Sequence, residues 1–106
     1  MTIYNKLVRD RIPEIIKGNG QECVAEILSD EDYIEALDKK LCEEMEEYQR
    51  DKSIDELADL LEVVYSVAKA RGWSVEELEN VRIKKAEKRG GFEDRIYLKE
   101  VYDKNE

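Results

Sequence analysis

The residues of this chain best suited to chemistry are carboxylates in two short groups. Glu43, Glu44 and Glu47 form the first group, and Glu56 and Asp59 form the second. Residues three or four apart share one side of a helix, so two packed helices would bring four or five carboxylates together. Oxygen ligands without histidine or cysteine suit a hard cation such as Mg²⁺ or Mn²⁺. The spacing therefore predicts a metal site; a solvated acidic surface and a plain capping role for Glu56 are the competing interpretations.

The composition excludes several other kinds of site. The chain has 106 residues, no histidine and two cysteines, Cys23 and Cys42, which form no CxxC motif. Histidine-based catalytic triads and the cysteine- or histidine-rich zinc modules are therefore excluded. We expect both cysteines to be unpaired thiols in a reducing compartment, most simply the cytoplasm. We expect neither a signal peptide nor a membrane-spanning segment.

The charge is unevenly distributed. The net charge is −9, and residues 22–62 carry 16 acidic and 4 basic side chains. An acidic middle segment repels a phosphate backbone, which argues against a nucleic-acid partner. It suits a cation, or a polyphosphate that arrives with a cation. A solvated acidic helix surface is the simpler alternative.

The length of 106 residues predicts a single domain over residues 1–106. Hydrophobic periodicity predicts that this domain is mainly α-helical. The second and third helices are joined by a short connection and should pack antiparallel. Ser53 and Glu56 open the third helix as a capping box, and Ser74 and Glu77 open the fourth. The four helices are expected at residues 10–17, 30–50, 53–71 and 74–89.

Two short apolar segments predict a small β element. Residues 22–28 (ECVAEIL) are bounded by turn residues, and residues 95–102 (RIYLKEVY) are rich in aromatic and β-branched side chains. Isolated strands need a partner, so we expect these two to pair as a two-stranded antiparallel element.

The third helix is apolar on two sides. Leu60, Val63 and Val67 lie roughly opposite a longer apolar face. A helix of this kind is buried on both sides, in a bundle or against another subunit. We therefore expect at least a homodimer, formed through this second face.

A basic segment complements the acidic one. Residues 82–89 hold five basic side chains and one acidic side chain, and Lys85 and Arg89 share one side of the helix. Such a cluster suits phosphate, although cations at a helix C-terminus are also favoured by the helix dipole. The N-terminal Lys6, Arg9 and Arg11 are further candidates for phosphate contacts, but their spacing alone does not indicate that role.

Three motifs together resemble a known family. The run Glu43-Glu44-Met-Glu-Glu47 followed by Glu56-Leu-Ala-Asp59 is similar to the EExxE…ExxD signature of the MazG-like all-α NTP pyrophosphatase superfamily. The segments YNKLVRDRIPEII and KKAEKRGGFEDRIYL resemble its phosphoribosyl-ATP pyrophosphohydrolase-like branch. The resemblance extends from Tyr4 to about Leu98. Only residues 48–55 separate the two carboxylate groups, fewer than is usual, so the ligands among the first group stay open.

The resemblance implies a helical bundle that dimerises, binds Mg²⁺ (or Mn²⁺) and hydrolyses the bond between the α- and β-phosphates of a nucleotide, canonical or not. The alternatives are phosphoribosyl-ATP as the substrate, and a non-catalytic helical dimerisation or regulatory module. Under the resemblance, Glu43 would accept a proton from water or position it, and Lys85 and Arg89 would stabilise the pyrophosphate leaving group. The metal would be held by Glu44, Glu47, Glu56 and Asp59.

Overall fold

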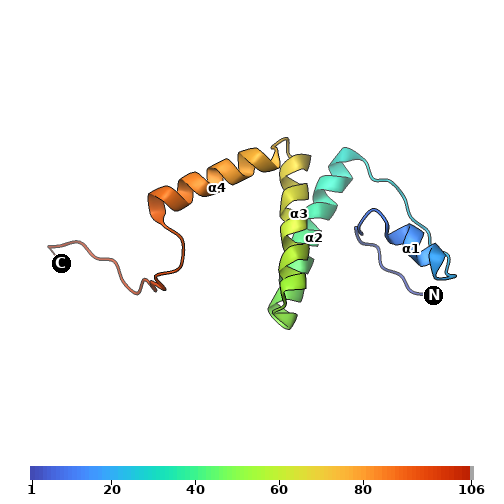
Figure 1. Cartoon of the computed structure of the whole chain (residues 1–106), viewed down its shortest axis with the longest axis horizontal. Coiled ribbons are helices and arrows are strands. Elements are labelled where there is room, and N and C mark those ends of the chain that lie inside the picture. Colours follow the sequence, from blue (N-terminus) through green and yellow to red (C-terminus); the bar gives the residue numbers. More distant parts are fainter. Residues whose placement is uncertain (106) are drawn as a thin grey trace. The chain divides into compact units, whose positions relative to one another are not determined.

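The computed structural model describes residues 1–105 and contains four α-helices (Figure 1). The four predicted helices are thereby confirmed. The chain divides into two units, Met1–Val75 and the residues from Glu76 onward, and each is described by itself. The single-domain organisation stays a prediction. The helices are α1 (Ile12–Gly18), α2 (Asp30–Asp51), α3 (Ile54–Ala70) and α4 (Val75–Arg89).

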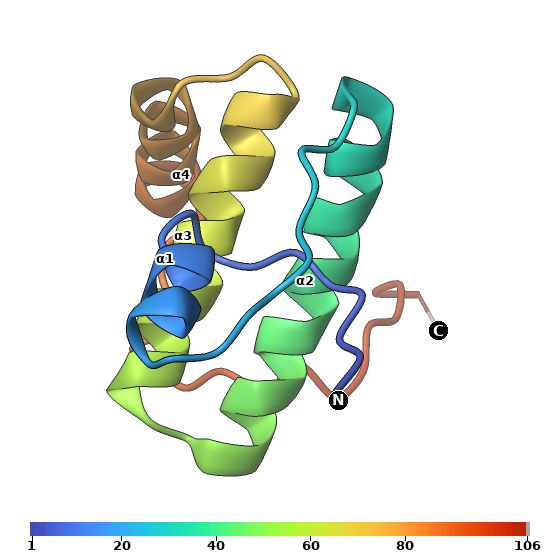
Figure 2. The ribbon, with the colours of Figure 1, turned by 90° about the vertical axis from the view of Figure 1, so that its right-hand side faces the viewer.

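Helices α2 and α3 form an antiparallel hairpin (Figures 1 and 2). Ser29 caps α2 by accepting a hydrogen bond from the Asp32 N–H at 3.2 Å. Lys52 ends the helix in the left-handed region, with φ of 53°, so that the chain reverses within two residues. Ser53 then caps α3 by accepting from the Glu56 N–H at 3.3 Å. Local chemistry thus sets the register in which the two helices face each other.

The hairpin core is small. Leu37 of α2 is 3% exposed, and Val63 and Ala68 of α3 are also buried. Leu60 and Val67 flank Val63 and are half-buried. The face that the sequence assigned to another subunit is therefore covered within the chain, against α2.

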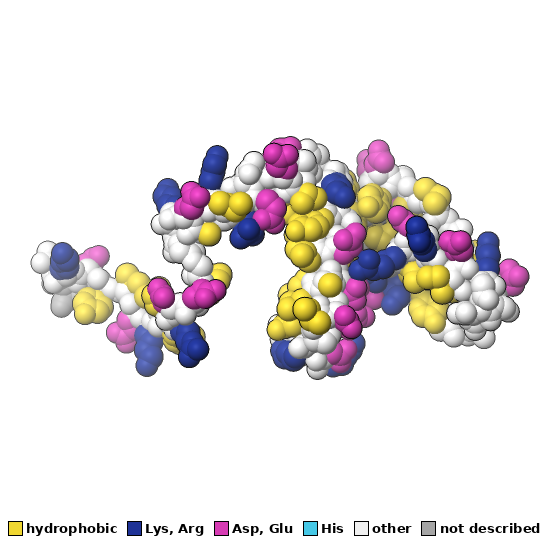
Figure 3. All heavy atoms as spheres, viewed as in Figure 1, with side chains coloured by type: hydrophobic (Ala, Val, Ile, Leu, Met, Phe, Trp, Pro, Cys, Tyr) yellow, Lys and Arg dark blue, Asp and Glu magenta, His cyan; other side chains and the backbone are white. Residues whose placement is uncertain are grey.

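The opposite face of α3 is the one left open. Ile54, Leu57 and Leu61 are 81%, 47% and 47% exposed. Figure 3 shows hydrophobic side chains gathered along this part of the hairpin. The exposed apolar stripe is thus on the other side of the helix from the predicted one.

The predicted β element is wrong. Residues 1–105 contain no strand, and residues 22–28 and 95–102 are irregular. Val24 and Ile27 are fully exposed, and Ile96 is 85% exposed, so these side chains bury almost nothing. A lone two-stranded ribbon is marginal in water, because burial must offset the entropy of ordering it. The fold of the described residues is all-helical.

Two further expectations concern the cysteines and the membrane. Cys23 and Cys42 are both free thiols, as predicted. Among the described residues, no helix combines the length and the apolar character that crossing a bilayer would require.

The second unit consists of most of α4 and an irregular C-terminal segment. Gly90 ends α4 with φ of +83°, and its N–H donates to the Ala86 carbonyl at 2.8 Å. Glycine adopts this left-handed conformation without the steric penalty that other residues incur. Lys85 and Arg89 are exposed on α4.

The Ser53 cap provides a test of how the hairpin is held. We expect Ser53→Ala to lower the free energy of unfolding by about 1 kcal/mol, because the Glu56 N–H loses its acceptor. Ser66→Ala, inside the same helix, is the matched control and should cause no comparable loss, since alanine favours a helix interior. Urea denaturation followed by circular dichroism measures both. Equal losses in the two variants would contradict the capping role.

Candidate metal centre

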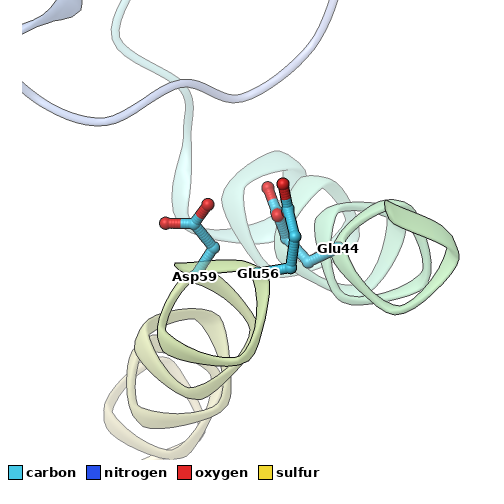
Figure 4. Close-up of side chains that lie close together, drawn as sticks. All are labelled: Glu44, Glu56 and Asp59. Carbon is cyan, nitrogen blue, oxygen red and sulfur yellow. The ribbon is translucent and has the colours of Figure 1, made fainter. Parts of the chain in front are cut away.

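Three carboxylates from the two helices meet beside the hairpin core. One oxygen from each of Glu44, Glu56 and Asp59 lies within 4.8 Å of the others. Figure 4 shows Glu44 of α2 next to Glu56 of α3, with Asp59 one turn further along α3 and all three pointing to the same side. Glu44 follows Leu37 by seven residues, two helical turns, so it shares the inward face of α2. The carboxylates converge because the antiparallel packing places both groups near the connection.

Glu44 is buried without enough partners. The residue is only 6% exposed, and its Oε2 is buried with no hydrogen-bond partner among the described residues. Glu56 Oε2 is in the same state. The neighbouring Glu47 cannot satisfy either oxygen when all are ionised, since carboxylates only accept hydrogen bonds. A buried acceptor of this kind destabilises the fold unless a positive group reaches it.

The pKa values reflect this crowding. Burial is the main cause that raises the pKa of Glu44, Glu47 adds to it, and the ion pair with Lys40 opposes it. The pKa of Glu56 is also raised, first by desolvation and then by the charges of Glu47 and other nearby carboxylates, including Asp59. Both raised pKa values mean that the ionised carboxylates are disfavoured here, and a nearby positive charge would favour them again.

Glu56 does more than cap α3. Its backbone N–H donates to Ser53 Oγ, but no return bond from the Ser53 N–H to the Glu56 side chain is found in the described residues. The carboxylate turns instead towards Glu44 and Asp59 (Figure 4). A plain capping box therefore does not account for this residue.

Three basic side chains compensate part of the negative charge. Lys40 lies 3.4 Å from Glu43 and 3.3 Å from Glu44. Lys6 pairs with Glu43 at 3.0 Å, and Arg9 pairs with Asp59 at 2.8 Å. Together with Glu47 and Glu56, the carboxylates outnumber these three cations, so the site keeps a negative excess.

Glu43 differs from the other predicted site residues. Its burial alone would raise its pKa, but the ion pairs with Lys6 and Lys40 outweigh this and lower the pKa. The pKa of Lys6 is raised, chiefly by its hydrogen bond to Glu43. Glu43 is thus ionised and engaged by two lysines, while Glu47 lies beside Glu44 and Glu56 but outside the group of three.

Two predicted site residues are not placed at the cluster. Lys85 and Arg89 belong to the second unit, and their predicted role at phosphate stays a prediction. The cations found at the carboxylates are Lys40 and the N-terminal pair Lys6 and Arg9. Lys40 could have been found, because it precedes Glu43 and Glu44 by three and four residues on one helix.

The residues fit a hard divalent cation. The donors are all carboxylate oxygens, which magnesium and manganese prefer to nitrogen or sulfur. Two of these oxygens, on Glu44 and Glu56, are buried and lack a protein partner among the described residues. The negative excess of the site has the sign that a cation needs. Glu44, Glu56 and Asp59 therefore form the candidate metal centre, with Glu47 beside them.

Comparisons with known proteins do not assign the chain to a family. No family model matches it, and no solved structure matches it. A stretch of 42 residues is 55% identical to part of an uncharacterized protein of Mycolicibacterium smegmatis. This stretch spans 40% of the chain and 43% of that protein.

The burial of Glu44 makes a testable prediction about stability. Glu44→Gln removes one charge at nearly constant volume, and its amide can donate to the neighbouring carboxylates. We expect the metal-free protein to gain on the order of 1 kcal/mol in unfolding free energy. Glu46→Gln, exposed on the same helix, is the matched control and should change stability little. Melting curves in the presence of a chelator decide this, and a clear loss of stability in Glu44→Gln would show that its charge is fully compensated.

Proposed function

We propose that this chain is a Mg²⁺-dependent nucleotide pyrophosphohydrolase, with Mn²⁺ as a substitute metal. It hydrolyses the bond between the α- and β-phosphates of a nucleoside triphosphate and yields a nucleoside monophosphate and pyrophosphate. The substrates include non-canonical nucleotides. The observation that carries the proposal is the buried Glu44, whose Oε2 lacks a partner and converges with Glu56 and Asp59. The nucleotide substrate is supported by the resemblance of the carboxylate motif to MazG-like enzymes.

The metal would be held by Glu44, Glu56 and Asp59, with Glu47 as a further ligand. When bound, it neutralises phosphate charge and lowers the pKa of a bound water. Glu43, which pairs with Lys40 on the same helix, would accept a hydrogen bond from the attacking water and so orient it.

Lys85 and Arg89 would contact the pyrophosphate leaving group. Both are basic side chains and lie one helical turn apart on α4. Cations on developing phosphate charge accelerate hydrolysis by stabilising the transition state. The role of Lys85 and Arg89 is supported by the resemblance to MazG-like enzymes alone. The role of the carboxylates is also supported by the convergence of Glu44, Glu56 and Asp59.

Metal binding and turnover test the proposal together. Mg²⁺ should raise the melting temperature of the parent protein, since a ligand stabilises the state that binds it by RT ln(1 + [L]/Kd). A panel of nucleotides that includes phosphoribosyl-ATP should yield pyrophosphate with Mg²⁺. Glu56→Gln should abolish the thermal shift and the turnover, while the exposed Glu46→Gln should retain both.

Two results would contradict the proposal in different ways. A thermal shift that persists in Glu56→Gln would mean that the carboxylate cluster is not the metal site. Metal binding without release of pyrophosphate from any nucleotide would favour the non-catalytic dimerisation or regulatory module.

We further propose that the chain forms a homodimer through the exposed stripe Ile54, Leu57 and Leu61. Exposed apolar side chains aligned on one helix face are typical of surfaces that meet another subunit.

Sedimentation tests the dimer. Leu57→Glu should yield a monomer at micromolar concentration, because a charge cannot be buried there without a partner. Val81→Glu, at a similarly exposed position of α4, is the control and should remain dimeric. A parent protein that sediments as a monomer would contradict the proposal.

A further inference from the structure

The N-terminal segment brings two cations to the carboxylates of both long helices. Lys6 reaches Glu43 of α2 from 37 residues away, and Arg9 reaches Asp59 of α3 from 50 residues away. Figure 4 shows the blue N-terminal trace passing on the side to which the carboxylates point. The segment therefore lies at the open side of the candidate metal centre.

Lys6 and Arg9 stay partly exposed to solvent although each forms an ion pair. The Arg9 side chain is 59% exposed and the Lys6 side chain 39% exposed. A guanidinium carries five N–H donors. The pair with Asp59 uses the Nη2 group of Arg9, so other donors stay available to a ligand. Exposed ion pairs contribute little to stability, so redirecting these groups costs little. Lys40 differs, because its side chain is 15% exposed and lies between Glu43 and Glu44.

A bound divalent cation would change what Arg9 and Lys6 face. Its charge would offset the carboxylates that now attract them, and a polyphosphate bound with it would bring new negative oxygens to the open side. Arginine matches phosphate geometry with two parallel N–H donors, and lysine supplies a point charge.

We propose that Lys6 and Arg9 are phosphate-binding residues, which serve as counter-ions of Glu43 and Asp59 until a metal-bound di- or triphosphate replaces these partners. The ligand class is thus a divalent-metal polyphosphate, and the N-terminal segment closes the site around it. This inference rests on the proposed function, since it requires a metal at the carboxylates.

Arg11 provides an internal comparison. It lies two residues from Arg9 and carries the same charge, but it is exposed and makes no ion pair within the described residues. A general attraction between a basic N-terminus and phosphate would involve Arg11 as much as Arg9. The structure assigns the role to Arg9 and not to its neighbour.

Calorimetry with Mg²⁺ alone, and then with inorganic pyrophosphate in saturating Mg²⁺, tests the inference. Pyrophosphate is the proposed product, so the proposed reaction does not consume it. Arg9→Gln should bind Mg²⁺ as well as the parent or a few-fold more tightly, because a competing cation has gone. It should bind pyrophosphate about tenfold more weakly, the equivalent of one charge-assisted hydrogen bond. Lys6→Gln should behave alike, Arg9→Lys should recover part of the loss, and Arg11→Gln should match the parent.

Each of the other calorimetry results would contradict a specific part of the inference or of the proposed function. Unchanged pyrophosphate affinity in Arg9→Gln and Lys6→Gln, with normal Mg²⁺ binding, would overturn the inference and leave the metal centre intact. Equal weakening in Arg11→Gln would mean attraction by net charge only. Loss of Mg²⁺ affinity in Arg9→Gln, with a lowered melting temperature, would make the segment a structural brace. A parent protein that binds no Mg²⁺ would overturn the proposed function and this inference together.

Discussion

The burial of one carboxylate governs the rest of this structure. Glu44 lies on the inward face of α2, in the row that also contains Leu37, and its Oε2 finds no protein donor among the described residues. A leucine there would pack against α3 at no electrostatic cost. A buried, partly unsatisfied carboxylate reduces stability, and this burial is the observation on which the proposed metal centre rests. The tight connection at Lys52 and the Ser53 cap make this possible, because they place Glu56 and Asp59 opposite it.

The compensation around Glu44 has a local and a long-range part. Lys40 is local, since it precedes Glu43 and Glu44 by about one helical turn, and its low exposure keeps it between them. Lys6 and Arg9 come from a distant segment and stay accessible to solvent. Lys40 is partly buried between its two carboxylates, whereas exposed cations can exchange partners at little cost. The same network therefore offsets part of the negative charge of the hairpin in the absence of a metal.

The parts of this fold that sequence reasoning predicted correctly depend on neighbours in the chain. The helix ends, the Ser53 cap and the carboxylate spacing all follow from interactions within about one turn. The β element failed because residues 22–28 and 95–102 have strand-like composition but bury little, and strands depend on partners that composition does not reveal. The inward face of α3 was also misassigned. Two apolar stripes on one helix look alike in sequence, and only packing against α2 distinguishes Val63 from Leu57. The pairing of Arg9 with Asp59 could not be predicted for the same reason, since the two residues are 50 positions apart.

The position of the carboxylates on α3 explains why so many are gathered. Glu56 belongs to the first turn of the helix, and Asp59 follows one turn later. The helix dipole places partial positive charge at this end, which favours carboxylates and disfavours a cation. This effect falls off within the first turn, and Glu56 Oε2 still lacks a partner among the described residues. The contribution of Glu44 and Glu47 from α2, whose own N-terminus lies far along the hairpin, supplies the negative excess that α3 cannot. The negative excess at this site is therefore a property of the hairpin and of neither helix alone.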